Sequence, residues 1–341
     1  MQWLAEITAC DKPAILVTVA SVEGSAPREA GAKMLVTPDR QFDTIGGGHL
    51  ELCAVDFARK MLAAPANELR SQRQLERFPL GPTLGQCCGG VVHLAFERVG
   101  RGASEFFADL RQRWQSGEQW WRRIAIDSTA PSTLMPPEDV RESGLSNACL
   151  LRRDEDGNRW LLDPCLPYRP RLFLFGAGHV GAALVRALAE LPCRVTWIDE
   201  REDVFPAQVP ENVRCEVSDR AEAIIDTAPS GASFLVMTHS HPLDQGLAES
   251  ILQRQEKRGD IGWFGLIGSR TKRIQFERRL LARGISKAHL EEMICPIGIA
   301  DIQGKQPAII ALSVAAQLLQ VWEQQQGVER RDQTARLENA G

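Results

Sequence analysis

The chain has little that would attach it to a membrane or to a nucleic acid. Its 341 residues carry a net charge of −4, so no basic field favours nucleic acid. The longest apolar-rich stretch, residues 308–319, is too short to span a bilayer and contains Ser313 and Gln317. The first twelve residues lack the basic and apolar regions of a signal peptide. We therefore expect a cytoplasmic protein without nucleic-acid or membrane partners.

The sequence also lacks any CxxC motif. Its nine cysteines are scattered singly, apart from the adjacent pair Cys87 and Cys88. This spacing excludes a zinc ribbon and favours free thiols in a reducing compartment. The hydrophobic content of 44% and the charged content of 25% are typical of a soluble globular protein, and the length allows two domains.

Residues 171–201 have the pattern of a strand, a glycine-rich turn, a helix and a second strand. Gly176, Gly178 and Gly181 follow an apolar run in the spacing GxGxxG. The first glycine permits a tight turn, the second lets a pyrophosphate approach the backbone, and the third lets the helix pack close to the sheet. The N-terminus of that helix offers free N–H groups to an anion. The sequence therefore predicts a Rossmann-type βαβ unit.

Polar side chains follow the predicted strands of this half of the chain. Ligands of open α/β sheets gather at the carboxyl ends of the strands. Asp199 ends the second strand, where an acid can bind a ribose hydroxyl, and Arg201 follows it. The other side chains expected at this edge are His179, His239, His241, Asp244, Ser269 and Arg270. The HxHxxD spacing also suggests a metal site, although histidines that hydrogen-bond a ligand are the milder interpretation.

The first half of the chain contains three glycine-marked loops. Arg28 lies between two predicted strands, as a solvated charge or as a clamp on phosphate. The run from Gly46 through Gly47 to Gly48 precedes a predicted helix that contains Glu51, and it is either an anion nest or a packed turn. Cys87 and Cys88 lie between glycines. They are either thiols that bind a soft metal or a sulfur atom, or small buried residues of a tight turn.

The predicted fold class is α/β with two domains. Residues 1–165 are expected to form an α+β domain, and residues 166–326 a Rossmann-like domain with a parallel sheet. The last helix is expected to end near Glu323, with a polar and unstructured tail over residues 327–341. A loop is expected at residues 294–298.

The order of motifs resembles the XdhC/CoxI family, and within it the XdhC branch. In the first half the motifs are GSAPREAGAKMLVT, TIGGGHLE and GQCCGG. In the second half they are FGAGHVGAALVRAL, WIDEREDVFP, VMTHSHPLDQGL, FGLIGSRTKR and PIGIADIQGKQPAIIALSVAAQLL. The resemblance runs from about residue 10 to residue 320. Ala308 departs from it, because many relatives have an acidic residue there, so a family role for that acid is in doubt.

The resemblance implies a chaperone rather than an enzyme. Proteins of this kind bind the molybdenum cofactor, shield it during sulfuration and deliver it to apo-xanthine dehydrogenase. A cysteine desulfurase would supply the sulfur, and a homodimer is one assembly to test. The cofactor-binding residues would be those of the three loops and of the predicted sheet edge, with Cys87 and Cys88 near molybdenum or sulfur. The alternatives are an NAD(P)-dependent oxidoreductase and a zinc hydrolase that uses His239 and His241.

Overall fold

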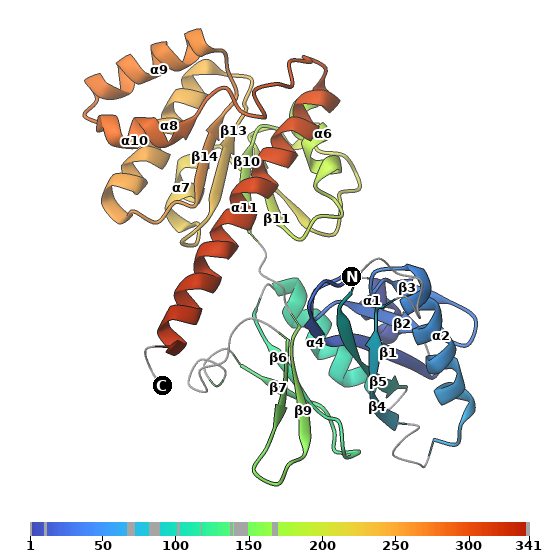
Figure 1. Ribbon diagram of the computed structural model, residues 1–341. Coiled ribbons are helices and arrows are strands. Elements are labelled where there is room, and N and C mark those ends of the chain that lie inside the picture. Colours follow the sequence, from blue (N-terminus) through green and yellow to red (C-terminus); the bar gives the residue numbers. More distant parts are fainter. Residues whose placement is uncertain are drawn as a thin grey trace. The chain divides into compact units, whose positions relative to one another are not determined.

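The computed structural model places the chain in two compact units. It describes residues 2–9, 12–66, 72–81, 89–100, 103–116, 118–136, 139, 149–165 and 170–338, with side chains up to residue 325. Unit 1 comprises Met1–Pro167 and unit 2 comprises Tyr168–Gly341 (Figure 1). Each unit has its own hydrophobic core, so each is described by itself.

Unit 1 is built on a five-stranded antiparallel sheet with the order β3-β2-β1-β5-β4. Its strands are β1 (Ala14–Glu23), β2 (Lys33–Val36), β3 (Gln41–Asp43), β4 (Arg73–Pro79) and β5 (Val91–Val99). The first seven residues of β1 are all buried, which explains the uninterrupted apolar run AILVTVA. A strand covered on both faces needs apolar side chains at every position.

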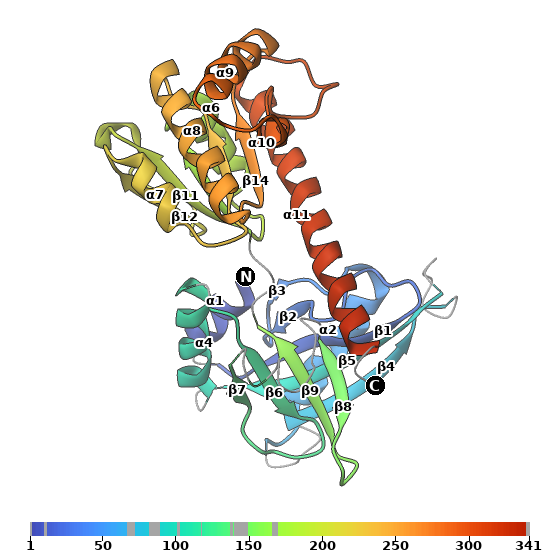
Figure 2. The ribbon, with the colours of Figure 1, turned by 90° about the vertical axis from the view of Figure 1, so that its left-hand side faces the viewer.

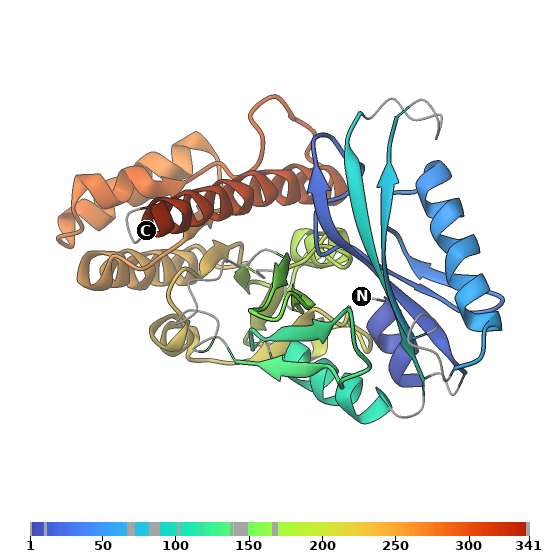
Figure 3. The ribbon, with the colours of Figure 1, turned by 60° about the horizontal axis from the view of Figure 1, so that its bottom comes forward.

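Different elements cover the two faces of this sheet (Figure 3). Helix α2 (Gly48–Ala63) packs on the face that carries Ile15 and Val17. The face that carries Leu16 is covered by α1 (Gln2–Ala9) and α4 (Ser104–Ser116). A second sheet, of order β7-β6-β9-β8, lies against Ala20. Its strands are β6 (Trp121–Ala125), β7 (Thr133–Met135), β8 (Leu150–Arg153) and β9 (Arg159–Pro164).

A cluster of buried charges joins the two sheets of unit 1. Arg122 on β6 is completely buried; its Nε donates to Asp163 Oδ2 at 3.0 Å and its Nη1 to Glu97 Oε2 at 2.9 Å. Lys33 Nζ lies 2.7 Å from Asp163 Oδ1, and Arg73 Nη2 lies 3.7 Å from Glu97 Oε1. Because buried charges are costly unless they are paired, the cluster fixes how the sheets face each other.

Unit 2 is a doubly wound parallel sheet. Its strand order is β12-β11-β10-β13-β14-β15, and every pair is parallel. The strands are β10 (Arg171–Phe175), β11 (Arg194–Asp199), β12 (Val213–Val217), β13 (Ser233–Val236), β14 (Trp263–Leu266) and β15 (Met293–Ile294). Counted within the unit, the order is 3-2-1-4-5-6, which is that of the Rossmann fold. The predicted fold class is confirmed.

Helices cover both faces of this sheet (Figure 2). One face packs against α7 (Ala221–Thr227), α8 (His241–Arg258), α9 (Arg270–Ala282) and α10 (Lys287–Glu292). The other face packs against α6 (His179–Ala187) and α11 (Pro307–Glu338). A short 3-10 helix, η3 (Glu202–Val204), follows β11. Among the described residues, no helix is both long enough and apolar enough to cross a bilayer.

The structure differs from the sequence-based expectation at both ends of the chain. Helix α1 was not predicted, although Trp3, Leu4 and Ile7 are buried at helical spacing. Helix α11 continues to Glu338 instead of ending near Glu323. Strand β15 occupies part of the predicted loop, because its two residues complete the edge of the sheet beside β14. A two-residue strand is too short for periodicity to reveal.

Candidate functional site

The carboxyl edge of the parallel sheet brings together side chains that are far apart in the sequence. Strand β10 ends at Phe175 and β13 at Val236, and the two strands are neighbours. Between them the direction of chain winding reverses, and such switch points are where open α/β sheets bind ligands. The turn of residues 176–181, here called the glycine turn, lies at this point.

The three glycines of the turn lie in different surroundings, so a side chain at each position would have a different effect. Gly176 has φ 112°, and a Cβ there would lie 2.4 Å from the carbonyl oxygen of Met237. A Cβ on Gly181 would lie 2.4 Å from the carbonyl oxygen of Gly176, so α6 approaches the turn closely. Gly178 is the N-cap of α6, and apart from its own residue and its two chain neighbours no atom of the described residues lies within 4 Å of a Cβ built on it. The open space therefore lies over Gly178, at the N-terminus of the helix.

Gly181→Ala is expected to lower the free energy of unfolding of the chain. The new methyl group would overlap the carbonyl oxygen of Gly176, so α6 or the turn must shift at a cost of about 1–3 kcal/mol. Gly246→Ala in α8 is the matched control, because its methyl group meets its nearest atom at an ordinary 3.5 Å. Denaturant unfolding measures both. Equal stability of the two variants would contradict the close packing of the turn.

Asp199, the acid expected to bind a ribose, is already engaged by protein donors. Its Oδ2 accepts the N–H of Ala177 at 2.7 Å and Nη2 of Arg201 at 3.1 Å. Its Oδ1 accepts the backbone N–H of Arg201 at 3.1 Å and Nε at 2.9 Å. A carboxylate has about four acceptor positions, and all four are used. A ribose diol could bind Asp199 only if Arg201 moved away.

The environment keeps the Asp199 carboxyl ionised. Burial would raise its pKa, but the hydrogen bonds from Arg201 and from the N–H of Ala177 outweigh burial and hold the pKa below its usual value. The Asp199–Arg201 pair therefore persists across neutral pH. Arg201 itself is about two-fifths exposed, so its outer face borders solvent.

The three residues of the HxHxxD motif do not share one environment. Asp244 is buried, and its Oδ1 accepts from the backbone N–H of Thr238 at 3.0 Å and from its hydroxyl at 2.7 Å. His241 is exposed at the start of α8, and the exposed His239 has its Nε2 3.7 Å from Oε1 of Glu200. The described part of the chain contains no group of three His, Cys, Asp or Glu side chains placed to hold a metal ion.

Lys272 belongs to this edge of the sheet but was not singled out from the sequence. Its Nζ lies 2.6 Å from Asp244 Oδ2 and donates to the carbonyl of Ile267 at 2.8 Å. It thereby ties the turn after β13 to the turn after β14. Ser269 accepts the backbone N–H of Lys272 and caps α9, and Arg270 is exposed in the first turn of that helix. Only the pairing of β13 with β14 reveals the contact, so no local signal could have found it.

The glycine-marked loops of unit 1 converge. A Cβ on Gly46 would lie 2.5 Å from Cβ of Pro27 and 3.3 Å from Cγ of Arg28. A Cβ on Gly90 would lie 2.3 Å from the carbonyl oxygen of Ser25, and one on Gly24 3.3 Å from Cα of Gly90. The loop that carries Arg28 therefore contacts Gly46 and the described Gly90. Arg28 itself is partly exposed and pairs with Glu29 at 3.2 Å.

The anion nest predicted at Gly46, Gly47 and Gly48 is partly filled by the protein itself. All three glycines have positive φ, but the N–H groups of Ile45 and Gly47 donate to Oε2 of Glu51 at 3.2 and 3.0 Å. The same carboxylate oxygen accepts from the hydroxyl of Thr44. The internal carboxylate takes the position that the sequence suggested for a phosphate, because Glu51 lies one helical turn beyond the loop.

Cys87 and Cys88 lie outside the described residues. The pair is expected to provide a reactive thiol. Cys149 and Cys165, two described cysteines of unit 1, have the opposite property. Burial raises the pKa of the Cys149 thiol to about 12 and also raises that of Cys165. A thiol that stays protonated is neither a good nucleophile nor a good metal ligand. Cys149 and Cys165 are therefore packing residues.

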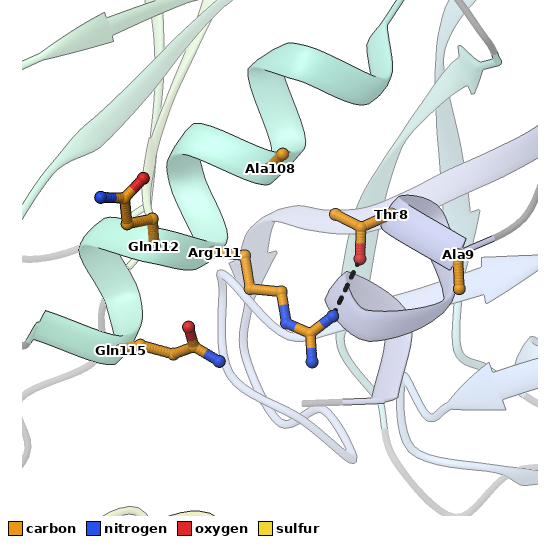
Figure 4. Close-up of a pocket in the computed structure, with 6 residues that line it drawn as sticks. All are labelled: Thr8, Ala9, Ala108, Arg111, Gln112 and Gln115. Carbon is orange, nitrogen blue, oxygen red and sulfur yellow. Dashed lines mark hydrogen bonds between the residues drawn. The ribbon is translucent and has the colours of Figure 1, made fainter.

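Each unit has a hollow in its described part. In unit 1 a shallow hollow lies between α1 and α4, where Arg111 Nη1 donates to Thr8 Oγ1 at 3.2 Å (Figure 4). It contains no predicted site residue. In unit 2 a hollow lies beside the glycine turn, and we call it the Asp199 hollow. Its lining comprises Phe175, Gly176, Ile198, Asp199, Glu200, Ser218, Asp219, Ala221, Thr238, His239, Leu243 and Leu247.

Comparison with known proteins covers both units. Residues 172–318 match the family model described as the XdhC Rossmann domain, and residues 8–73 match that of the XdhC and CoxI family. A Bacillus subtilis (strain 168) protein named as a probable subunit of xanthine dehydrogenase is 25% identical over 90% of this chain and 92% of its own length. The Escherichia coli (strain K12) protein named "Molybdenum cofactor insertion chaperone PaoD" is 26% identical over 94% and 87%.

A solved structure has the same fold. A crystal structure titled as a xanthine dehydrogenase from Bacillus halodurans is 21% identical, covers 95% of each chain and gives a TM-score of 0.69. At this level of identity the likeness concerns the arrangement of the chain and not its chemistry.

Proposed function

The chain belongs to the XdhC and CoxI family, and from this we propose that it binds the molybdenum cofactor, protects it during sulfuration and delivers it to apo-xanthine dehydrogenase. The similarity to a named molybdenum cofactor insertion chaperone extends over nearly the whole chain and supports this proposal. The protein acts by binding and release and has no turnover of its own. A cysteine desulfurase is the proposed source of sulfur.

The observation that carries the proposal is the open glycine turn beside a saturated Asp199. The molybdenum cofactor ends in a phosphate, and a phosphate fits over Gly178 at the N-terminus of α6. The Gly46–Gly48 loop fits a phosphate less well, because the carboxylate of Glu51 already accepts from its N–H groups. The residues of unit 2 thus favour an anionic end group over a ribose diol.

The residues that we propose to contact the rest of the molybdenum cofactor come from both units. In unit 2 the exposed His179, His239, His241 and Arg270 border the sheet edge. In unit 1 the converging loops present Arg28, and Cys87 and Cys88 supply soft sulfur donors. The molybdenum centre supplies its redox chemistry only in the recipient enzyme. This chain's residues hold the cofactor and exclude water from it.

An NAD(P)-dependent oxidoreductase is the second candidate. The complete glycine turn in a 3-2-1-4-5-6 sheet favours it. The engagement of both Asp199 oxygens counts against it, because the usual acceptor for the ribose hydroxyls is occupied. The two candidates differ in turnover, since only the second consumes NAD(P)H.

A transfer assay tests the proposed function. The purified protein is incubated with molybdenum cofactor, separated from unbound cofactor and mixed with apo-xanthine dehydrogenase. We expect xanthine oxidation to appear in proportion to the cofactor delivered, and none when the cofactor is omitted. Consumption of NAD(P)H by the protein alone, without restored xanthine dehydrogenase activity, would replace the first candidate with the second.

Gly178→Ala is expected to weaken cofactor binding by about tenfold or more while the melting temperature changes little. Its methyl group would enter the open space over the turn and keep an anion from the N–H groups, and the φ of −77° suits alanine. Gly246→Ala again serves as the matched control, with unchanged binding expected. Cofactor retained after gel filtration is the measurement. If Gly178→Ala retains as much cofactor as the parent, the turn has only a structural role.

A further inference from the structure

Helix α9 carries basic and apolar side chains on its outer surface. Its 13 residues include five basic side chains and one acidic one, although the whole chain has a net charge of −4. Ile274 and Leu281 have 50% and 48% of their surface exposed. At about 3.6 residues per turn, four exposed side chains fall within an arc of about 80°, and we call them the α9 stripe: Arg270, Ile274, Arg278 and Leu281.

The two arginines of the α9 stripe are available to a partner, whereas inner charges of the helix are already used. Lys272 Nζ lies 2.6 Å from Asp244 Oδ2, which fixes the first turn of α9 on unit 2. The acidic residue of the helix, Glu277, accepts from Nε of Arg273 at 2.7 Å and does not neutralise the stripe. Within the described residues, the side chains of the two stripe arginines have no hydrogen bond or ion pair.

The composition of the α9 stripe favours an acidic protein surface as its partner. Guanidinium groups form charge-assisted hydrogen bonds with carboxylates, and exposed apolar side chains beside charged ones are typical of protein interfaces. A helix that lies in a membrane needs a wide apolar face. The apolar side of α9, with Phe276 and Leu280, is buried in the core of unit 2 and cannot enter a bilayer.

The start of α9 places the stripe beside the proposed cofactor site. Strand β14 ends at Leu266 and α9 begins at Arg270, so the first turn of the helix lies at the carboxyl edge of the sheet. We propose that the α9 stripe docks an acidic and apolar surface of the enzyme that receives the cofactor, an inference that rests on the proposed function. A recipient docked there lies next to this edge, so the cofactor passes to it without release into solvent.

A binding assay with apo-xanthine dehydrogenase tests the charges of the stripe without any cofactor. Biolayer interferometry with the immobilised apo-enzyme and the full chain gives the dissociation constant. Arg278→Glu should weaken binding by about tenfold, because like charges would then face each other, and the affinity of the parent should fall as salt rises. Arg214→Glu is the matched control and should bind like the parent, because Arg214 is exposed on β12, at the other edge of the sheet from β15.

The double variant Ile274→Ala and Leu281→Ala tests the apolar part of the stripe. Loss of both apolar contacts should weaken binding to the apo-enzyme by about tenfold or more. Thermal melting and cofactor retention should stay those of the parent, because both side chains are exposed and outside the proposed cofactor site. Leu312→Ala is the control, because Leu312 on α11 is 64% exposed and outside the stripe.

Three results would overturn the proposal. The first is that the parent does not bind the apo-enzyme at micromolar concentration. The second is that Arg278→Glu or the double alanine variant binds it like the parent. The third is that the stripe serves another occupant: Arg278→Glu abolishes binding of the parent to phosphatidylserine vesicles, or its self-association in the ultracentrifuge.

The outcomes also separate docking from the proposed function. Variants that retain the cofactor but no longer deliver it to the apo-enzyme support both. If the parent and the variants deliver it equally well, the docking proposal fails and the proposed function stands. If the parent binds the apo-enzyme through the stripe but restores no xanthine oxidation, the proposed function fails and the docking surface stands.

Discussion

Arg122→Met should lower the free energy of unfolding of unit 1 by about 3–5 kcal/mol, the usual effect of removing one partner from a buried ion pair. The guanidinium is completely buried and donates to both Asp163 and Glu97. Without it, the fully buried Asp163 keeps, among the described cations of unit 1, Lys33 at 2.7 Å. Methionine fills most of the volume of the arginine side chain. The loss of free energy of unfolding therefore comes from unpaired buried charge rather than from a cavity. Denaturant unfolding of the full chain measures it.

Arg153→Met is the control for this experiment. Arg153 is exposed on β8 of the same sheet and makes a hydrogen bond to the carbonyl of Gly157 at 3.0 Å. Its replacement should change the free energy of unfolding by less than about 0.5 kcal/mol. Similar losses in the two variants would contradict the assigned role of the buried ion cluster.

The same cluster predicts a dependence of stability on pH. Burial would raise the pKa of Asp163, but Lys33 and Arg122 outweigh burial and hold the pKa below the ordinary value of 3.8. The unfolded chain therefore binds a proton at a higher pH than the folded chain. The stabilisation is complete above the ordinary pKa and is lost as the pH falls through the depressed one. Removal of Arg122 should move acid unfolding to a higher pH, which circular dichroism can follow.

Replacing Cys87 and Cys88 together with alanine is expected to remove most of the bound molybdenum cofactor. A thiolate is a soft donor that suits molybdenum or a transferable sulfur atom. Alanine at one of the two positions should cost most of the retention or transfer, and at the other much less, because only the thiol of lower pKa is reactive. The measurement is cofactor retained per monomer after gel filtration.

Cys53→Ala is the matched control for the cysteine variants. Cys53 lies on α2 with intermediate exposure, outside the three loops. Thermal melting should be similar for all variants, since alanine replaces cysteine at modest cost. If the double variant retains and delivers cofactor like the parent, the thiols are only packing residues, and Arg28 and the glycine turn must hold the cofactor.

Local patterns determined much of the site in unit 2. The spacing of Gly176, Gly178 and Gly181 is read from adjacent residues, and the structure gives each glycine the geometry that this spacing requires. Most strands could be predicted from apolar runs, because a strand that is buried on both faces needs apolar residues throughout. Helix α1 was missed because eight residues with three buried side chains give a weak periodic signal.

The Rossmann-type unit, the two-domain α/β architecture and the family could be predicted from the sequence alone, since each depends on short-range patterns and on the order of motifs. Which of the candidate groups remain available to a ligand depends on contacts that are visible only in the folded chain. Asp199 is saturated by Arg201 and Ala177, Asp244 is bound to Lys272, and the N–H groups of the loop before α2 donate to the carboxylate of Glu51. Strand order brings Lys272 to Asp244 and Ala177 to Asp199, whereas Arg201 and Glu51 are close in sequence to the groups that they bind. In each case the geometry of the loop decides the pairing, and a residue pattern does not reveal that geometry.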